Sequence, residues 1–229
     1  MQTGTGDMQG YIADSNYKWA ASLNNSQIRL LFEKSTLLTY EKGESILKQG
    51  SLASQIYFVE EGIAKLNFES SGRDTTFAFA TNGDFIGLMC SFVKKRLEFS
   101  AVAITTTKVR IIERDIFEEL IGSNGGFAVN IVKLMSEVTN SVVHMLITLS
   151  HKNVNGSVAS LLITLSKLYN SDSFQIPFSR DEMASALGYS KESVINTLSS
   201  FHQDQIVSVS GRNLKILQPN TLVLVAEKG

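Results

Sequence analysis

The sequence predicts an α+β fold in which an antiparallel β domain is followed by a long helix and a C-terminal helix-turn-helix with a hairpin. Three observations predict this fold. Short apolar or alternating runs separated by glycine turns occupy residues 40–112, which is typical of an antiparallel sandwich or barrel. A heptad-like apolar pattern covers residues 127–150. Two short capped helices and a hairpin pattern lie within residues 179–217.

Length and composition set the first limits. The 229 residues allow two modest domains, and 43% hydrophobic against 19% charged residues allows each to bury a core. Cys90 is the one cysteine, which excludes an intrachain disulfide and a cysteine-rich metal cluster and suggests a reducing, cytoplasmic location. No Lys or Arg precedes Lys18 and no apolar segment follows the start, so we expect no secretory signal. We also expect no membrane helix, because the uncharged stretch 138–151 is short and broken by polar residues.

The N-terminal half contains the β domain. Residues 1–25 are polar and glycine-containing, and we expect a loose start. A helical pattern at 27–33 precedes the β region, and a second short amphipathic helix at 116–121 follows it. The strands that we expect between them are 45–48, 56–59, 64–68, 75–80, 100–104 and 109–112.

A long helix is predicted over residues 127–150. One set of its apolar residues is separated by four, three, four, three and four positions, as in a coiled-coil seam. The alternative is a helix that packs only on its own domain, and the apolar residues Leu134, Val143, Leu146 and Ile147 could serve that purpose. We favour a dimer helix, because a helix with two apolar faces can pack one face against a partner chain and the other against its own β domain. The expected interface residues are Ile131, Met135, Val138, Val142, Met145 and Leu149.

The C-terminal segment begins after a break at 153–156, which we interpret as a hinge. Ser179 and Glu182 form the spacing of a capping box, and a helix follows that ends at Gly188. Ser190 then caps a second helix, and the runs 206–209 and 214–217 around a Ser-Gly-Arg-Asn turn form a hairpin. An ordinary helical pair with a hairpin is the alternative to a DNA-binding module.

Charge decides little between these two interpretations. Residues 179–217 are neutral, since Arg180, Lys191, Arg212 and Lys215 oppose Asp181, Glu182, Glu192 and Asp204. The basic residues nevertheless lie at a helix start, on the second helix and in the hairpin, where they could face phosphates. The residues that we expect to contact DNA are Ser179, Arg180, Ser190, Lys191, Glu192, Ser193, Asn196, Arg212 and Lys215.

At this point the chain resembles a known family. The winged helix-turn-helix of the Crp/Fnr family of bacterial transcription regulators is similar to SRDEMASALGYSKESVINTLSSFHQDQIVSV (179–209). Its sensor domain is similar to KQGSLASQIYFVEEGIAKL (48–66) and NGDFIGLM (82–89). The resemblance covers about residues 28–218 and implies an antiparallel β-roll or jelly-roll sensor domain. The domains that we expect are a loose N-terminus (1–25), the β-roll (26–122), a dimerisation helix (123–152) and a winged helix-turn-helix domain (153–229).

The resemblance also raises the question of an effector. Family members that respond to cyclic AMP hold the ribose with a Glu, the phosphate with an Arg-Ser pair and the base with a Thr-Ser pair. The matching positions here are Leu88, Phe99-Ser100 and Val142-Val143, so only Ser100 is kept. A buried phosphate without a cationic partner is unfavourable, so we expect no control by cyclic AMP. These residues predict an apolar effector pocket, with plain core packing as the alternative.

The expected function is that of a dimeric, sequence-specific DNA-binding transcription regulator of Crp/Fnr type. Its expected partners are double-stranded DNA with an inverted-repeat operator, a second copy of the chain, RNA polymerase and an unknown small-molecule effector, and no membrane. We expect no metal and no cofactor, since one cysteine cannot hold an iron–sulfur cluster and Cys90 is more typical of core. No catalytic motif is present, so we expect no enzyme. The alternative is a β-roll signalling or scaffolding protein without DNA activity.

Overall fold

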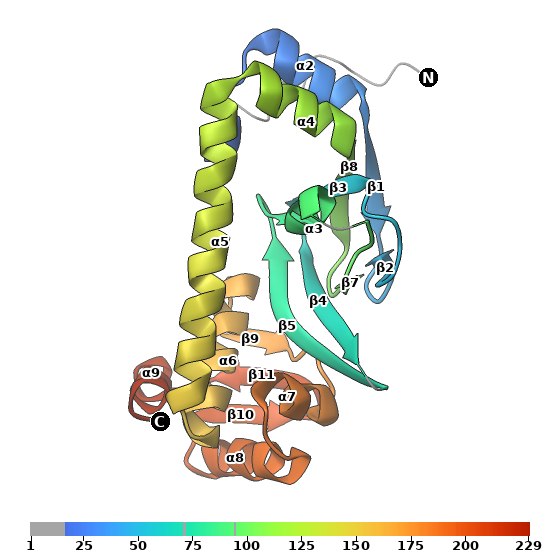
Figure 1. Cartoon of the computed structure of the whole chain (residues 1–229). Coiled ribbons are helices and arrows are strands. Elements are labelled where there is room, and N and C mark those ends of the chain that lie inside the picture. Colours follow the sequence, from blue (N-terminus) through green and yellow to red (C-terminus); the bar gives the residue numbers. More distant parts are fainter. Residues whose placement is uncertain (1–16, 71, 94) are drawn as a thin grey trace. The chain divides into compact units, whose positions relative to one another are not determined.

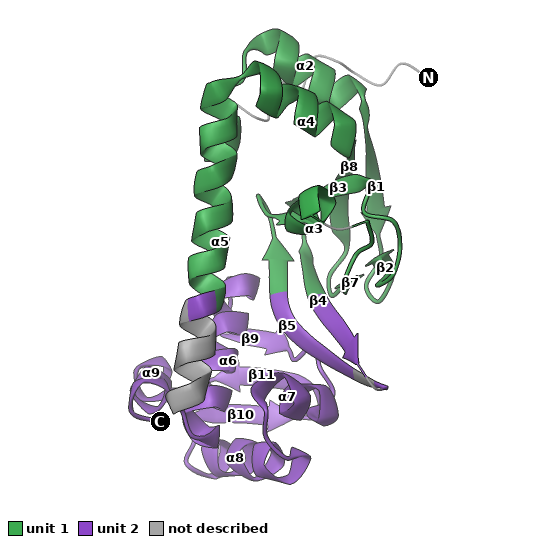
Figure 2. Cartoon of the chain, viewed as in Figure 1, with its two compact units in different colours: residues 1–65, 79–142 green, residues 66–78, 143–229 purple. Residues whose placement is uncertain are grey.

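The computed structural model describes the backbone of residues 17–70, 72–93 and 95–229, and their side chains except those of 73 and 144–151. The chain forms two compact units, which are described separately (Figure 2). Unit 1 comprises Met1–Lys65 and Phe79–Val142, and unit 2 comprises Leu66–Ala78 and Val143–Gly229. The division passes through two strands and the long helix.

Two antiparallel four-stranded sheets form the β domain, as the sequence predicts (Figure 1). In the first sheet the order is β1 (Ser35–Tyr40), β8 (Thr107–Glu113), β3 (Gln55–Glu61) and β6 (Phe85–Ile86). In the second it is β2 (Ser45–Leu47), β7 (Ser100–Ala103), β4 (Ile63–Ser70) and β5 (Arg73–Thr81). Strand β1 was not expected from the sequence. Its central residues are all exposed, so it lacks the alternation that marks a half-buried strand.

Helices and aromatic side chains close the core of unit 1. The helices are η1 (Lys18–Ala20), α2 (Asn25–Glu33), α3 (Leu88–Val93), α4 (Arg114–Ser123) and α5 (Gly125–His151). Trp19 packs edge-on against Phe58 and Phe85, with ring centroids 5.2 and 5.0 Å apart. Phe117 and Phe127, from α4 and α5, make a similar contact at 5.2 Å. The start of α5 is thereby fixed to the core of its own unit.

A buried ion pair lies beside this core. Arg110 on β8 donates from Nε to Glu60 on β3, and both side chains are almost fully buried. The guanidinium also donates to Ser35 Oγ at 3.1 Å and lies 4.3 Å from the ring centre of Phe32. The Arg110 guanidinium therefore connects strands β1, β3 and β8 with helix α2. The Ser35 hydroxyl and the Phe32 ring interact with it in addition to the Glu60 carboxylate.

Unit 2 contains a small helical domain with a three-stranded sheet of order β10-β11-β9. Its core is built from apolar residues of several helices, including Leu162, Met183 and Val194, which are fully buried. Its elements are α6 (Val154–Tyr169), β9 (Ser173–Gln175), α7 (Arg180–Leu187), α8 (Lys191–Gln203), β10 (Val207–Ser210), β11 (Asn213–Ile216) and α9 (Pro219–Lys228). This is the predicted helix-turn-helix with its hairpin, followed by a helix that starts at a proline.

The predicted hinge at 153–156 takes a different form. Asn153 caps α6, and its side chain accepts hydrogen bonds from the backbone of Asn155 at 2.9 Å and Gly156 at 3.0 Å. Asn153 N in turn donates to the backbone oxygen of Gly229 at 2.7 Å. The helix break therefore lies between His151 and Val154, and residues 154–156 form the first turn of α6.

Candidate nucleic-acid interface

Local capping interactions fix the start of α7, its end and the start of α8. Ser179 Oγ accepts from Glu182 N at 3.1 Å, while Glu182 Oε2 accepts from Ser179 N at 2.6 Å, so the predicted capping box is formed. Gly188 ends α7 with φ 73°, a left-handed conformation that favours glycine. Ser190 Oγ then accepts from Ser193 N at 3.1 Å and starts α8. The turn is thus determined by residues within it.

Helix α8 has one buried and one exposed side. The buried side consists of Val194, Thr197, Leu198 and Phe201. The exposed side carries the residues Lys191, Glu192, Ile195, Asn196, Ser199 and Ser200. A helix with a polar exposed side that includes hydrogen-bond donors and acceptors has the chemistry needed to read base edges in a major groove.

Two of the predicted DNA contacts have partners within the unit. Lys191 Nζ lies 2.7 Å from Asp181 Oδ2 across the turn, and both side chains are more than half exposed. Arg180 Nη2 donates to the backbone oxygen of Gly211 at 3.0 Å. Burial lowers the pKa of the Arg180 guanidinium, and the nearby charge of Arg212 lowers it further. Arg180 therefore contacts the hairpin turn with one edge of its guanidinium.

The hairpin wing carries its cations outward. Strands β10 and β11 pair Val207 with Ile216 and Ser208 with Lys215. Leu214 and Ile216 are buried, while Arg212 and Lys215 are exposed. The wing is also tied to the end of α8, since His202 Nδ1 accepts from Val209 N at 3.2 Å. Sequence reasoning missed His202 because a lone histidine late in a helix has no distinctive signal.

The residues expected to form an effector pocket have different environments. Leu88 is 4% exposed and belongs to the hydrophobic core, whereas Phe99 and Ser100 are half-buried. Val142 and Val143 are exposed on α5. Ser100 Oγ accepts from Gln49 N at 3.0 Å. The nearby cation, Arg96, donates from Nη1 to the backbone oxygen of Gly50 at 2.7 Å.

The expected dimer seam is corrected at its first residue. Ile131 is 3% exposed and packs in the core cluster of its own unit, with Met135 against it, so Ile131 is not on a free face. Val138 and Val142 are exposed, at 43% and 40%. The side chains of Met145 and Leu149 lie outside the described residues. The heptad spacing identified an apolar stripe, but its N-terminal part faces the chain's own β domain.

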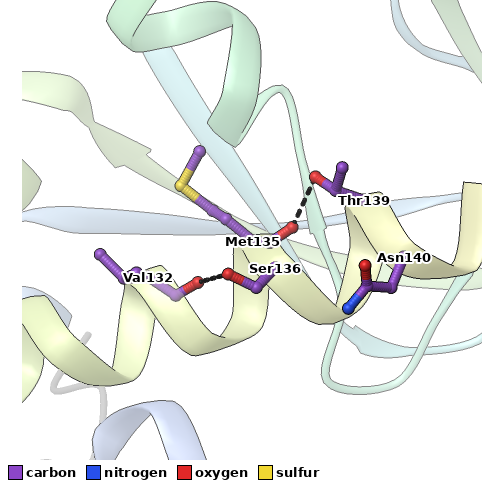
Figure 3. A pocket seen from close by; sticks show the side chains of 5 residues that line it. All are labelled: Val132, Met135, Ser136, Thr139 and Asn140. Carbon is purple, nitrogen blue, oxygen red and sulfur yellow. Dashed lines mark hydrogen bonds between the residues drawn. The ribbon is translucent and has the colours of Figure 1, made fainter. Parts of the chain in front are cut away.

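A neighbouring face of α5 is exposed instead. Val129 and Val132 are 53% and 62% exposed. Ser136 and Thr139 continue the three-four spacing, and their hydroxyls donate to the carbonyls of Val132 and Met135 at 2.8 Å (Figure 3). Because these hydroxyls are satisfied within the helix, the side chains present little unmet polarity. A shallow pocket on this face is lined by Val132, Met135, Ser136, Thr139 and Asn140.

Sequence reasoning also missed a set of contacts behind the interface. Tyr189 in the turn donates from its hydroxyl to the backbone oxygen of Lys152 at 2.5 Å. Thr197 on α8 donates to Asn155 Oδ1 at 2.9 Å. The available signal was a threonine within the apolar stripe of α8, where a buried hydroxyl needs a partner. These contacts attach the turn and α8 to the start of α6.

Comparisons with known proteins find matches for both the β domain and the C-terminal domain. A family model described as a cyclic nucleotide-binding domain matches residues 37–124, and one described as a Crp-like helix-turn-helix domain matches residues 156–224. The transcriptional activator protein Anr of Pseudomonas protegens is 26% identical over 192 residues, which are 81% of this chain and 78% of that protein. The fumarate and nitrate reduction regulatory protein of Vibrio cholerae is also 26% identical, over 81% of this chain and 76% of its own length.

Solved structures with a similar fold include members of the same kind of regulator. FixK2 from Bradyrhizobium japonicum has a TM-score of 0.71 and 25% identity, covering 83% of this chain and 96% of that one. A protein from Eubacterium rectale described as a Crp/Fnr-family transcriptional regulator has a TM-score of 0.76 and 19% identity, covering 95% and 99%. Among the described helices, none is long and apolar enough to cross a membrane. The described residues also contain no cluster of three or more His, Cys, Asp or Glu that could hold a metal ion.

Proposed function

Because this chain belongs to the Crp/Fnr family of DNA-binding transcription regulators, we propose that it acts as a homodimer that reads an inverted-repeat operator with α8. The observation that carries the proposal is the exposed side of α8, with Lys191, Glu192 and Asn196, beside a wing with exposed Arg212 and Lys215. The helix would enter the major groove, and the wing cations would contact phosphates.

The exposed residues differ in what they can recognise. The Glu192 carboxylate can accept from cytosine N4, and the Asn196 amide suits the N6 and N7 edge of adenine. Lys191 can donate to guanine or to phosphate once it leaves Asp181. Ser190 and Ser193 share a hydrogen bond of 2.8 Å at the start of α8, at the edge of the proposed site. Ser179 serves α7 as a cap and would contribute through the N-terminus of that helix.

The proposed dimer uses the exposed face of α5. Val129, Val132, Ser136 and Thr139 follow heptad spacing, and Val143 continues it along the sequence. This face replaces the seam through Ile131 and lies beside the exposed Val138 and Val142. A two-fold dimer would bring two α8 helices into successive major grooves, so the half-sites would be about one helical turn, ~34 Å, apart.

The proposed regulator does not respond to cyclic AMP. Phe99 stands where a phosphate-binding Arg would be needed, and it cannot pair with an anion. Of the polar groups nearby, Ser100 accepts from Gln49 N and Arg96 donates to the backbone oxygen of Gly50. An unknown effector, contact with RNA polymerase and a cytoplasmic location complete the proposal. The family consists of transcription regulators, and no catalytic role is proposed.

Selection of binding sites from a random DNA pool tests the proposed function. The expected result is an inverted repeat, bound with an affinity that falls steeply as salt rises. Glu192→Ala should relax preference at one base pair, worth ~1–3 kcal/mol, whereas Lys215→Ala should weaken binding to all sequences alike. An unselective pool with no salt-dependent binding would favour a signalling or scaffolding role, which the neutral charge of residues 179–217 also allows.

A further inference from the structure

We infer that Ile195 is a specificity-determining residue that recognises the 5-methyl group of a thymine in each operator half-site. The inference rests on the proposed DNA-reading function and adds to it the identity of one base and the chemical group recognised. Ile195 does not belong to the hydrogen-bonding set Lys191, Glu192 and Asn196, and it would act by apolar contact alone.

The position of Ile195 on α8 is the first observation. Its side chain is 39% exposed, and it is the large apolar residue on the exposed side of the described α8. It lies one helical turn after Lys191 and one turn before Ser199, so it shares the exposed side of α8 with these two residues. Glu192 and Asn196 flank it on the same side. A helix that places Glu192 and Asn196 against base edges therefore brings Ile195 into the groove as well.

Folding accounts for only part of an isoleucine at this place, because the side chain is 39% exposed. The core side of α8 is already complete, with Val194, Leu198 and Phe201 buried. A β-branched residue is a weaker helix former than alanine or the long polar residues, so Ile195 does not favour the helix. Its exposed surface is in contact with water in the free chain, which is unfavourable. The exposed part of the side chain is stabilised when another apolar group covers it.

The major groove offers one apolar group on a base edge, the 5-methyl of thymine. Contact between this methyl and the Ile195 side chain buries both without loss of a hydrogen bond. Cytosine, guanine or adenine at the same place would set a donor or acceptor against an apolar surface and leave it unpaired. Ile195 would therefore select thymine by attraction to the methyl and by exclusion of the polar edges.

Replacement of thymine by deoxyuridine provides a direct test, because the two bases differ only in the methyl group. The selected operator is synthesised with deoxyuridine at one thymine position in both half-sites, and each thymine is examined in turn. For the wild-type protein we expect deoxyuridine to weaken binding at one thymine position. The loss should be about four-fold when one half-site is substituted and about fifteen-fold when both are. The other positions should change little.

Variants of the protein complete the test. Ile195→Ala should bind the thymine operator more weakly and show no further loss with deoxyuridine at that position, whereas Ile195→Val should keep part of the sensitivity. Ser199→Ala, one turn away, is the matched control and should keep the full penalty. The salt dependence should be the same for all four proteins, because no charge changes. Thermal unfolding of Ile195→Ala should lie close to that of the wild type, because the side chain is outside the buried side of α8 and alanine favours the helix.

The outcomes separate this inference from the proposed function. Specific binding with no deoxyuridine penalty at any thymine overturns the inference and leaves the proposed function standing. An equal penalty in wild type and Ile195→Ala also overturns it, because the methyl is then read by another residue. Absence of specific DNA binding by the wild type overturns the proposed function and the inference together.

Discussion

Thr197 on α8 donates its hydroxyl hydrogen to Asn155 Oδ1 in the first turn of α6, at 2.9 Å. Thr197 is 4% exposed, so this hydroxyl has little access to water. Tyr189 makes a second connection, to the backbone oxygen of Lys152 between α5 and α6. The helix proposed to read DNA is therefore attached directly to the segment that follows the long helix.

Thr197→Val should lower the free energy of unfolding by about 1 kcal/mol and weaken operator binding. Valine has the same shape but leaves Asn155 without this donor, and water can partly replace it at the exposed amide. Chemical denaturation and DNA titration measure the two effects. Thr197→Ser keeps the hydroxyl and should recover most of the DNA affinity. Equal DNA binding by the valine variant and the wild type would show that the contact does not orient α8.

Asp181→Asn should strengthen DNA binding by about two- to five-fold at low salt. The substitution frees Lys191 and removes a negative charge next to the proposed phosphate surface. Stability should change by less than about 1 kcal/mol, because the pair is exposed. Glu227→Gln, which removes an exposed acidic charge on α9, is the control and should have a smaller effect. Titrations at several salt concentrations give the comparison, and weaker binding by Asp181→Asn would contradict the proposed surface.

Glu60→Gln should destabilise unit 1 by about 3–5 kcal/mol. It removes the carboxylate partner of the buried Arg110 guanidinium, and breaking a buried ion pair from one side is strongly unfavourable. The adjacent Glu61 provides a matched control, because its pair with Lys108 is exposed and Glu61→Gln should change stability by less than about 1 kcal/mol. Urea unfolding measures both. A similar decrease in the free energy of unfolding for the two variants would mean that the buried pair contributes no more to stability than the exposed one.

Val132→Glu should convert the proposed dimer into a monomer without unfolding it. The side chain is 62% exposed in the single chain, so the charge is tolerated there, but two such charges in a helix–helix contact are not. Ile131→Asp should unfold unit 1 instead, because Ile131 is buried in its core. Light scattering and circular dichroism distinguish these results. Glu137→Lys is the control, and a dimeric Val132→Glu protein would place the interface elsewhere.

Titration with cyclic AMP should give no heat of binding at micromolar protein concentration. Phe99 occupies the position where a phosphate-binding Arg would be expected. Ser100 and Arg96 form hydrogen bonds with backbone groups. Calorimetry provides the measurement. A micromolar or tighter dissociation constant would contradict the prediction, and its loss in Arg96→Ala would then identify the anion ligand.

The sequence by itself determined the elements whose causes are local. The capping box of Ser179 and Glu182, the glycine at the end of α7 and the cap at Ser190 all act within a few residues, and the helix-turn-helix formed as predicted. Glycine turns between short apolar runs likewise predicted most of the β domain. These signals were sufficient because each one is a hydrogen bond or a backbone conformation that neighbouring residues supply.

Only the tertiary structure decided which partners distant residues would have. The apolar spacing of α5 could not show that Ile131 faces the aromatic core. A heptad pattern has the same spacing whether the helix packs on its own domain or on a second chain. The sequence likewise could not show that Arg180, which is expected to contact DNA, also bonds Gly211, or that Arg110 pairs with Glu60, fifty residues away. Such contacts depend on chain segments meeting in space, and that meeting follows from burial of the whole core rather than from any local pattern.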